Sequence, residues 1–137
     1  LGRLIDYALA LEGSLKLKEI SYINSATYPA GELKHGTISL IEENTPVISI
    51  ITESSIKEKT ISNIKEIKAR GASSIVVTTD DVDNEIYDDI IMIPKINKFL
   101  QPIITIIPLQ LLAYQVAKNN NCDIDKPRNL AKSVTVE

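Results

Sequence analysis

Residues 46–79 read PVISIITESSIKEKTISNIKEIKARGASSIVVTT and decide the fold class. Residues 47–52 and 74–79 are short runs rich in β-branched side chains, which is typical of buried strands. Between these runs, isoleucines recur at helical spacing over residues 56–70, and Gly71 ends the pattern. A strand, a helix and a second strand in this order predict a crossover unit in a parallel sheet.

The rest of the chain continues the alternation of helices and strands. Asp6 is a plausible N-cap for a helix over residues 7–25, and a short helical segment is expected at 32–36. Residues 90–93 resemble a third strand, and residues 99–117 form a long apolar helix. The sequence therefore predicts an α/β fold, a three-layer αβα sandwich with a mostly parallel sheet.

Length and composition fit one globular domain with a sizeable core. The chain has 137 residues, of which 44% are hydrophobic and 24% charged. A net charge of -3, no Trp and one Phe argue against a nucleic-acid partner. A single cysteine, Cys122, fits a reducing compartment, and we predict a cytoplasmic protein. Because the sequence starts at Leu1 without Met, we expect a fragment of a longer polypeptide.

The apolar stretch 99–117 carries no charge and is long enough to span a bilayer. Three glutamines and two prolines dilute it, and these would need partners in lipid. We therefore predict a buried or interface helix and no membrane association.

A narrow stripe of charge lies in the first predicted helix. Glu12, Lys16 and Glu19 are spaced three and four residues apart and fall on one helical face. Apolar residues flank this stripe on both sides, so it does not resemble a solvated outer face. Glu19 is a candidate catalytic acid or base, because such groups are often found in apolar surroundings. It is equally a candidate for a purely structural pair with Lys16.

Further candidates each have a functional and a structural interpretation. His35, the only histidine, lies in the polar loop 31–36 and is either a proton shuttle or an ordinary surface histidine. Lys132 is either an amine nucleophile towards a carbonyl group or a lysine favoured near a helix end. The segment 52–55 opens a helix and could hold a phosphate, but it has no glycine, so we assign its serines to helix capping. Cys122 receives no catalytic role, and we find no motif for a metal or a cofactor.

Four blocks taken together resemble one known family. They are residues 12–22 (EGSLKLKEISY), 31–36 (GELKHG), 108–114 (PLQLLAY) and 127–137 (PRNLAKSVTVE). Their order and spacing are similar to those of the C-terminal sugar isomerase (SIS) domain of glutamine:fructose-6-phosphate aminotransferases, the glucosamine-6-phosphate synthases. The resemblance covers essentially the whole chain, and it implies that residues 1–137 form a single SIS domain, the second isomerase domain of a longer synthase.

The resemblance also implies an activity and a set of site residues. The family converts fructose 6-phosphate and glutamine to glucosamine 6-phosphate and glutamate. By resemblance, Glu19 moves a proton between C1 and C2 of the sugar, and Lys16 lies beside it. His35 assists ring opening from the neighbouring subunit. Lys132, in an active-site tail over residues 123–137, forms a Schiff base with the C2 carbonyl.

The implied partners are a glutaminase domain and a first SIS domain in the same polypeptide, together with a second copy of the protein in a homodimer. Because the ammonia source and the phosphate clamp belong to those other domains, we expect the isolated chain to lack synthase activity. Two departures from the family pattern are visible. Leu4 stands where a glycine is usual, so a different local turn is expected, and the first strand of the fold would be cut off before Leu1.

Two other classes of function remain open from the sequence. One is a phosphosugar-binding SIS module without catalysis, which would need neither Glu19 nor Lys132. The other is a dimerisation scaffold, for which the apolar stretch 99–117 is the main argument.

Overall fold

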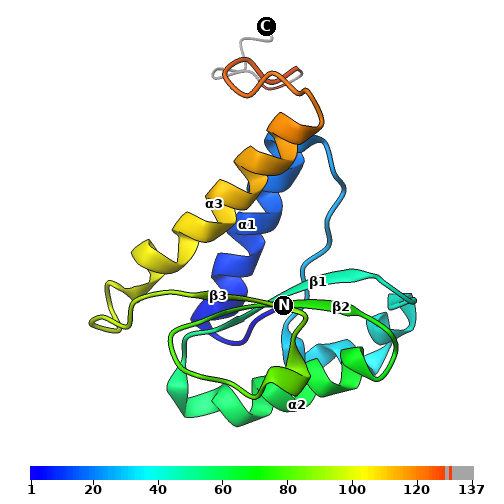
Figure 1. Cartoon of the computed structure of the whole chain (residues 1–137), viewed down its shortest axis with the longest axis vertical. Coiled ribbons are helices and arrows are strands. Elements are labelled where there is room, and N and C mark those ends of the chain that lie inside the picture. The colour runs from blue at the N-terminus through cyan, green and yellow to red at the C-terminus, as the bar shows by residue number, and fades with distance from the viewer. Residues whose placement is uncertain (129, 131–137) are drawn as a thin grey trace, which may run out of the picture.

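The structure is a computed structural model that describes residues 1–128 and 130, and it confirms the three-layer α/β arrangement (Figure 1). In chain order its elements are α1 (Ile5–Ser21), the 3-10 helices η1 (Ala30–His35) and η2 (Thr37–Leu40), β1 (Pro46–Ile51), η3 (Ser54–Ile56), α2 (Lys57–Lys68), β2 (Ser73–Thr78), η4 (Asn84–Ile86), β3 (Asp89–Met92) and α3 (Gln101–Asn119).

The three strands form a parallel sheet in the order β1-β2-β3. Ile48 pairs with Ile75, and Val77 pairs with Ile91. Figure 1 shows α1 and α3 side by side on one face of the sheet and α2 on the other. At the free edge of β1, the backbone of Leu1 donates to Ile48 O and accepts from Ile50 N, which is the pattern of a parallel neighbour.

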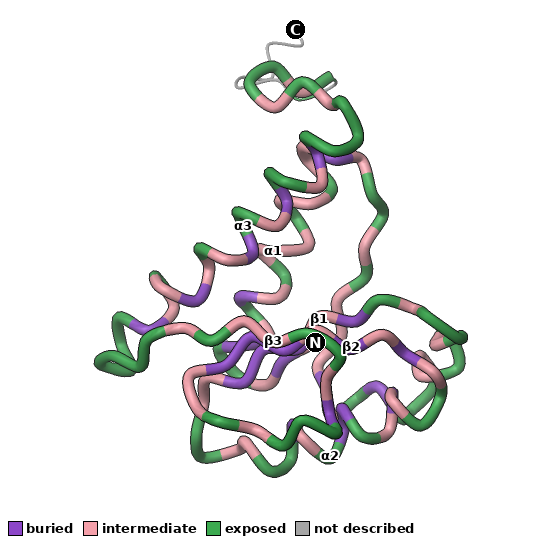
Figure 2. The backbone as a smooth tube through the Cα atoms, viewed as in Figure 1, coloured by how far each residue is buried: buried purple, intermediate pink, exposed green. Residues whose placement is uncertain are grey.

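The core has two sides because neighbouring strand residues point to opposite faces. Towards α1 and α3, the buried cluster contains Leu9, Ile50, Val77 and Leu109. Towards α2, the buried cluster contains Ile51, Ile64, Val76 and Ile86. Figure 2 shows the buried residues concentrated where strands and helices meet. Each such side chain contributes about 1.5–3 kcal/mol by leaving water, so both faces stabilise the sheet.

Helices α1 and α3, which cover the same face of the sheet, approach each other closely at Gly13. A Cβ atom placed on Gly13 would lie 2.9 Å from Cδ1 of Leu109, closer than carbon atoms tolerate. A side chain at position 13 would therefore force Leu109 or the spacing of α1 and α3 to change.

The outer face of α3 is apolar and exposed. Its large side chains are Ile103, Ile107, Leu111 and Tyr114, and the N-cap residue Leu100 is exposed beside them. Within the described residues, no helix is both long and apolar enough to cross a bilayer. The apolar character of α3 thus divides between a buried side against α1 and a side open to solvent.

Asp6 does not cap α1, and the sequence-based prediction was wrong here. It is the second residue of the helix, only 2% exposed, and its carboxylate accepts hydrogen bonds from Thr52 N at 2.9 Å, Glu53 N at 3.3 Å and the Thr52 hydroxyl. The N-cap is Leu4, whose side chain makes no capping bond. The carboxylate therefore satisfies backbone donors of another element, the chain that leaves β1.

Two other local predictions also need correction. Helix α1 ends at Ser21 rather than near Ser25, because Tyr22 adopts a left-handed conformation with φ 60°. Helix α2 begins at Lys57, after the separate turn η3, and no serine side chain caps it. The predicted elements at 32–36, 47–52, 74–79 and 90–93 are confirmed to within two residues.

Leu4 adopts a backbone conformation that glycine favours. Its φ is 52° and its ψ is -123°, a combination that side chains with a Cβ rarely adopt. The side chain is 68% exposed, so packing does not offset this strain. Leu4 thus stands in a conformation that glycine favours, and the expectation that this turn differs from the family's stays a prediction.

We predict that Asp6→Ala lowers the free energy of unfolding by about 2 kcal/mol, because it leaves partly buried donors at the end of β1 without an acceptor. Urea unfolding followed by circular dichroism measures the change. Asp81→Ala, at an exposed aspartate, serves as the control and should stay within about 0.5 kcal/mol of the parent. Equal effects of the two substitutions would contradict the role given to Asp6.

We predict that Leu4→Gly raises the stability by about 1 kcal/mol, since glycine adopts a positive φ without steric cost. Leu40→Gly, at a leucine that is 61% exposed but lies outside the positive-φ residues, should instead be neutral or destabilising. Thermal unfolding of both variants gives the comparison. A loss of stability in Leu4→Gly would show that the strain is absent.

Candidate active site

The charged stripe on α1 forms a compact cluster in the structure. Lys16 Nζ lies 2.7 Å from Glu19 Oε2 and 3.4 Å from Glu12 Oε1. Their spacing of three and four residues along α1 produces both contacts. The side chains are half-buried, with 32% of Lys16 and 24% of Glu19 exposed. The sequence therefore correctly predicted which side chains meet, while the cluster is more open to solvent than expected.

The electrostatics of the cluster give Lys16 a definite protonation state. The hydrogen bond with Glu19 raises the pKa of the Lys16 ammonium above its ordinary 10.5, and Glu12 adds to the effect, while partial desolvation opposes it. Lys16 is thus a cation at neutral pH. An amine that forms an imine must first lose its proton, so Lys16 is suited to orient Glu19 rather than to act as a nucleophile.

The segment after α3 lies at the C-terminal end of α1 (Figure 1). The backbone N–H of Arg128 donates to the Tyr22 hydroxyl at 2.7 Å, and the Arg128 guanidinium lies 4.3 Å from the centre of the Tyr22 ring. Tyr22 follows Glu19 by three residues. Sequence reasoning missed this contact, since no local pattern connects two residues that are 106 positions apart.

The other predicted site residues are not brought to the cluster within the described chain. His35 is exposed at the end of η1, a segment that packs against α2 and η2. Gly36, with φ 151°, follows it and allows the chain to turn. Lys132 lies outside the described residues. For the part of the predicted tail that is described, residues 125–128 form bends and a turn.

Most backbone donors of the segment after β1 are already bonded within the protein. The N–H groups of Thr52 and Glu53 bind Asp6, and the N–H and hydroxyl of Ser55 bind the Glu53 carboxylate. These bonds from Ser55 hold the pKa of Glu53 below its usual value. Two carboxylates thus take the positions that a phosphate would need, which agrees with the structural interpretation of this segment. The serine of the loop binds Glu53, however, and does not cap α2.

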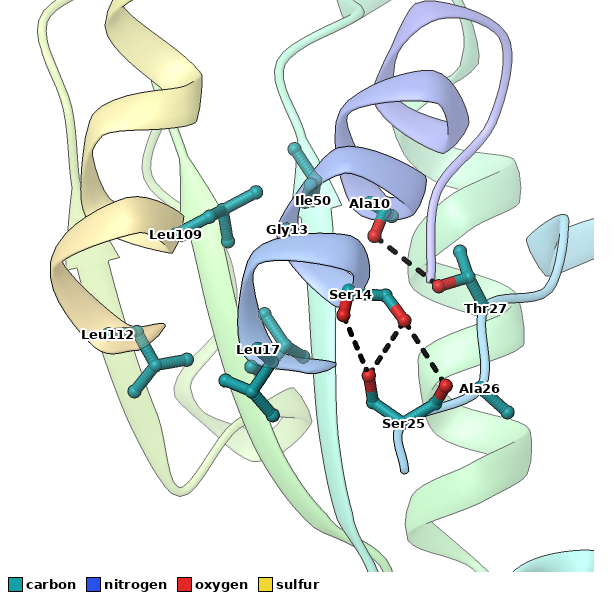
Figure 3. A pocket seen from close by; sticks show the side chains of 11 residues that line it. Ala10, Gly13, Ser14, Leu17, Ser25, Ala26, Thr27, Ile50, Leu109 and Leu112 are labelled. Carbon is teal, nitrogen blue, oxygen red and sulfur yellow. Dashed lines mark hydrogen bonds between the residues drawn. The ribbon is translucent and has the colours of Figure 1, made fainter. Parts of the chain in front are cut away.

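A cavity of about 90 Å³ lies between α1, β1, α3 and residues 25–27 (Figure 3). Its walls are mainly apolar and include Leu17, Ile50 and Leu109. Ser14 and Ser25 are joined at its rim by a 2.7 Å hydrogen bond between their hydroxyls. Among the described residues, none of the predicted catalytic side chains lines the cavity, which is therefore separate from the charged cluster on α1.

The fold and the cluster define a three-layer α/β domain in which an acid and an amine meet on the first helix. The chain belongs to the SIS-domain family, whose model matches residues 1–119. This finding confirms the resemblance inferred from the four sequence blocks.

The chain is also similar to individual proteins of known name and to solved structures. The chain is 56% identical over its whole length to the glutamine–fructose-6-phosphate aminotransferase (isomerizing) of Caldanaerobacter subterraneus and 54% identical to that of Clostridium acetobutylicum. It spans 23% of the length of either relative. Among solved structures, it is similar to the C-terminal domain of glucosamine-fructose-6-phosphate aminotransferase from Francisella tularensis, with a TM-score of 0.85 and 38% identity. That match covers 91% of this chain and 36% of the other.

We predict that Glu19→Gln lowers the pKa of Lys16 towards 10.5, because the principal cause of its elevation is removed. NMR titration of the Lys16 side chain measures the change. Since the folded pKa is the higher one, the stability that the pair contributes is complete below pH 10.5 and is lost as the pH rises through the folded pKa. A Lys16 pKa that does not respond to Glu19→Gln would contradict the pairing.

Proposed function

We propose that this chain is the second isomerase domain of a glutamine–fructose-6-phosphate aminotransferase, which forms glucosamine 6-phosphate and glutamate from fructose 6-phosphate and glutamine. The observation that carries the proposal is the identity of 56% over the entire chain to an enzyme of that name. The acid–amine cluster on α1 supports a catalytic role for the domain.

In this proposal Glu19 transfers the proton between C1 and C2 of the open-chain sugar. One carboxylate oxygen, Oε2, is bonded to the Lys16 ammonium, and within the described residues no hydrogen bond occupies Oε1. A carboxylate held on one side and open on the other can accept a proton from carbon and return it to the neighbouring carbon. Lys16 fixes the orientation of the acid and compensates its charge.

Lys132 is the proposed amine. Its Nζ attacks the C2 carbonyl, water leaves, and the resulting imine withdraws electrons from C1 so that the C1 proton becomes acidic. Lys132 follows Arg128 by four residues, and an extended chain spans at most about 3.6 Å per residue. The amine-bearing backbone is therefore tethered within about 14 Å of the Tyr22 contact, at the end of the helix that carries Glu19.

The remaining parts of the proposal concern the parent protein. A glutaminase domain supplies ammonia, a first SIS domain binds the phosphate, and His35 acts in the site of the neighbouring subunit of a cytoplasmic homodimer. The apolar outer face of α3 supports an interface with another domain or subunit. Because the ammonia source and the phosphate site lie elsewhere, the chain alone is proposed to lack synthase activity.

The test uses the full-length protein that carries this chain, fructose 6-phosphate and borohydride, followed by peptide mapping. We expect a hexose adduct on Lys132 in the parent and in Glu19→Gln, and none on this residue in Lys132→Arg. Exchange of the C1 proton with solvent should fall by about 10²-fold or more in Glu19→Gln. Glu58→Gln, at an exposed glutamate of α2, is the matched control and should change neither readout.

An adduct on a lysine other than Lys132 would overturn the assignment of the amine. Undiminished C1 exchange in Glu19→Gln would overturn the assignment of the base. Binding of fructose 6-phosphate with neither imine nor exchange in the parent protein would instead favour the phosphosugar-binding module that lacks catalysis.

A further inference from the structure

Tyr22 combines an unfavourable backbone conformation with a specific long-range contact. Its φ of 60° and ψ of 17° place it in the left-handed region at the C-terminus of α1, where glycine is the usual residue. A bulky side chain is uncommon in this region, and such positions are often found at functional sites. Since glycine would fit this backbone without strain, the contacts of the Tyr22 side chain indicate what tyrosine adds.

The left-handed turn itself serves to reverse the chain. After Tyr22 the backbone runs back along α1, where Ser25 Oγ donates to Ser14 O at 3.2 Å and Thr27 Oγ1 donates to Ala10 O at 3.3 Å (Figure 3). Glycine would allow the same reversal without strain. The chain reversal accounts for the left-handed backbone of Tyr22, but it does not require the phenol side chain.

The phenol side chain of Tyr22 contacts Arg128 in the segment after α3. The hydroxyl of Tyr22 accepts the Arg128 backbone N–H, while the guanidinium of Arg128 lies over the ring face, so one side chain holds both the backbone and the side chain of the same residue. Within the described residues, the other hydrogen bonds of residues 123–128 are local, from Asp125 N and Lys126 N to Asp123. Within this part of the chain, Tyr22 is thus the residue of α1's C-terminal end that holds the tail by a hydrogen bond and a ring contact.

We propose that Tyr22 is a positioning residue that clamps the C-terminal tail to the end of α1 through Arg128 and thereby keeps Lys132 within reach of Glu19. This inference rests on the proposed function and deepens it. Without the clamp, Lys132 is tethered to the end of α3 at Asn119 by thirteen residues, and with the clamp by four. Effective concentration falls roughly as the −3/2 power of tether length, so the clamp raises the local concentration of the amine roughly sixfold.

The experiment compares Tyr22→Phe, which keeps the ring and loses the hydroxyl, with Tyr22→Leu, which loses both, in the full-length protein. Hydrogen exchange of the Arg128 amide should be faster in both variants. The rate of borohydride trapping on Lys132 should fall about sixfold in Tyr22→Leu and less in Tyr22→Phe. The KM for fructose 6-phosphate should stay unchanged, because the clamp does not touch the substrate, and this separates positioning from a general loss of structure.

Two further variants make the result decisive. Arg128→Ala removes the stacking partner at an exposed position and should reproduce the slower trapping even if Tyr22→Leu does not fold. Lys126→Ala removes a cation from the same tail, two residues away, and should leave trapping and exchange unchanged.

The outcomes distinguish this inference from the proposed function. Equal trapping on Lys132 in the parent, Tyr22→Leu and Arg128→Ala overturns the clamp and leaves the proposed function intact. No adduct on Lys132 in the parent, with faster exchange in the Tyr22 variants, overturns the proposed function and the catalytic purpose of the clamp, and leaves Tyr22 as an anchor only.

Discussion

A buried carboxylate joins the first helix to the sheet, and the position of the candidate site depends on it. Asp6 accepts two backbone N–H groups and a hydroxyl where the chain leaves β1, so the first turn of α1 is fixed to the carboxyl end of that strand. Removing this carboxylate would leave partly buried N–H groups without an acceptor, and the resulting loss of stability exceeds that expected for an ordinary surface contact. The attachment fixes the first turn of α1 relative to the sheet, and this position determines which side of the helix exposes its charged residues.

One face of α1 packs against α3, and a neighbouring face carries the charged cluster. Leu9 and Gly13 face the buried layer against α3, while Lys16 and Glu19 emerge beside this contact with about a quarter to a third of each side chain exposed. This partial exposure is suitable for a base that must meet a substrate. A fully buried pair would be closed to ligands, and a fully solvated pair would have little orientation.

The sequence predicted those features that depend on neighbours along the chain. The strands and helices followed from periodicity, and the contact of Lys16 with Glu19 followed from a spacing of three residues. Asp6 was misassigned because its residue type suits an N-cap, whereas the choice between its own helix and a distant strand end is made by tertiary structure. The left-handed turn at Tyr22 and its contact with Arg128 were also invisible, since neither leaves a local pattern.

Gly13 links the packing of α1 and α3 to the charged cluster in a way that concerns sequence change. A Cβ at this position would lie 2.9 Å from Cδ1 of Leu109, so a larger residue at 13 requires Leu109 to shift. Lys16 lies one helical turn beyond Gly13 on the same rigid rod. A bulkier residue at 13 would disturb the packing of the helix that carries the acid–amine pair, and its effect would depend on the side chain at position 109.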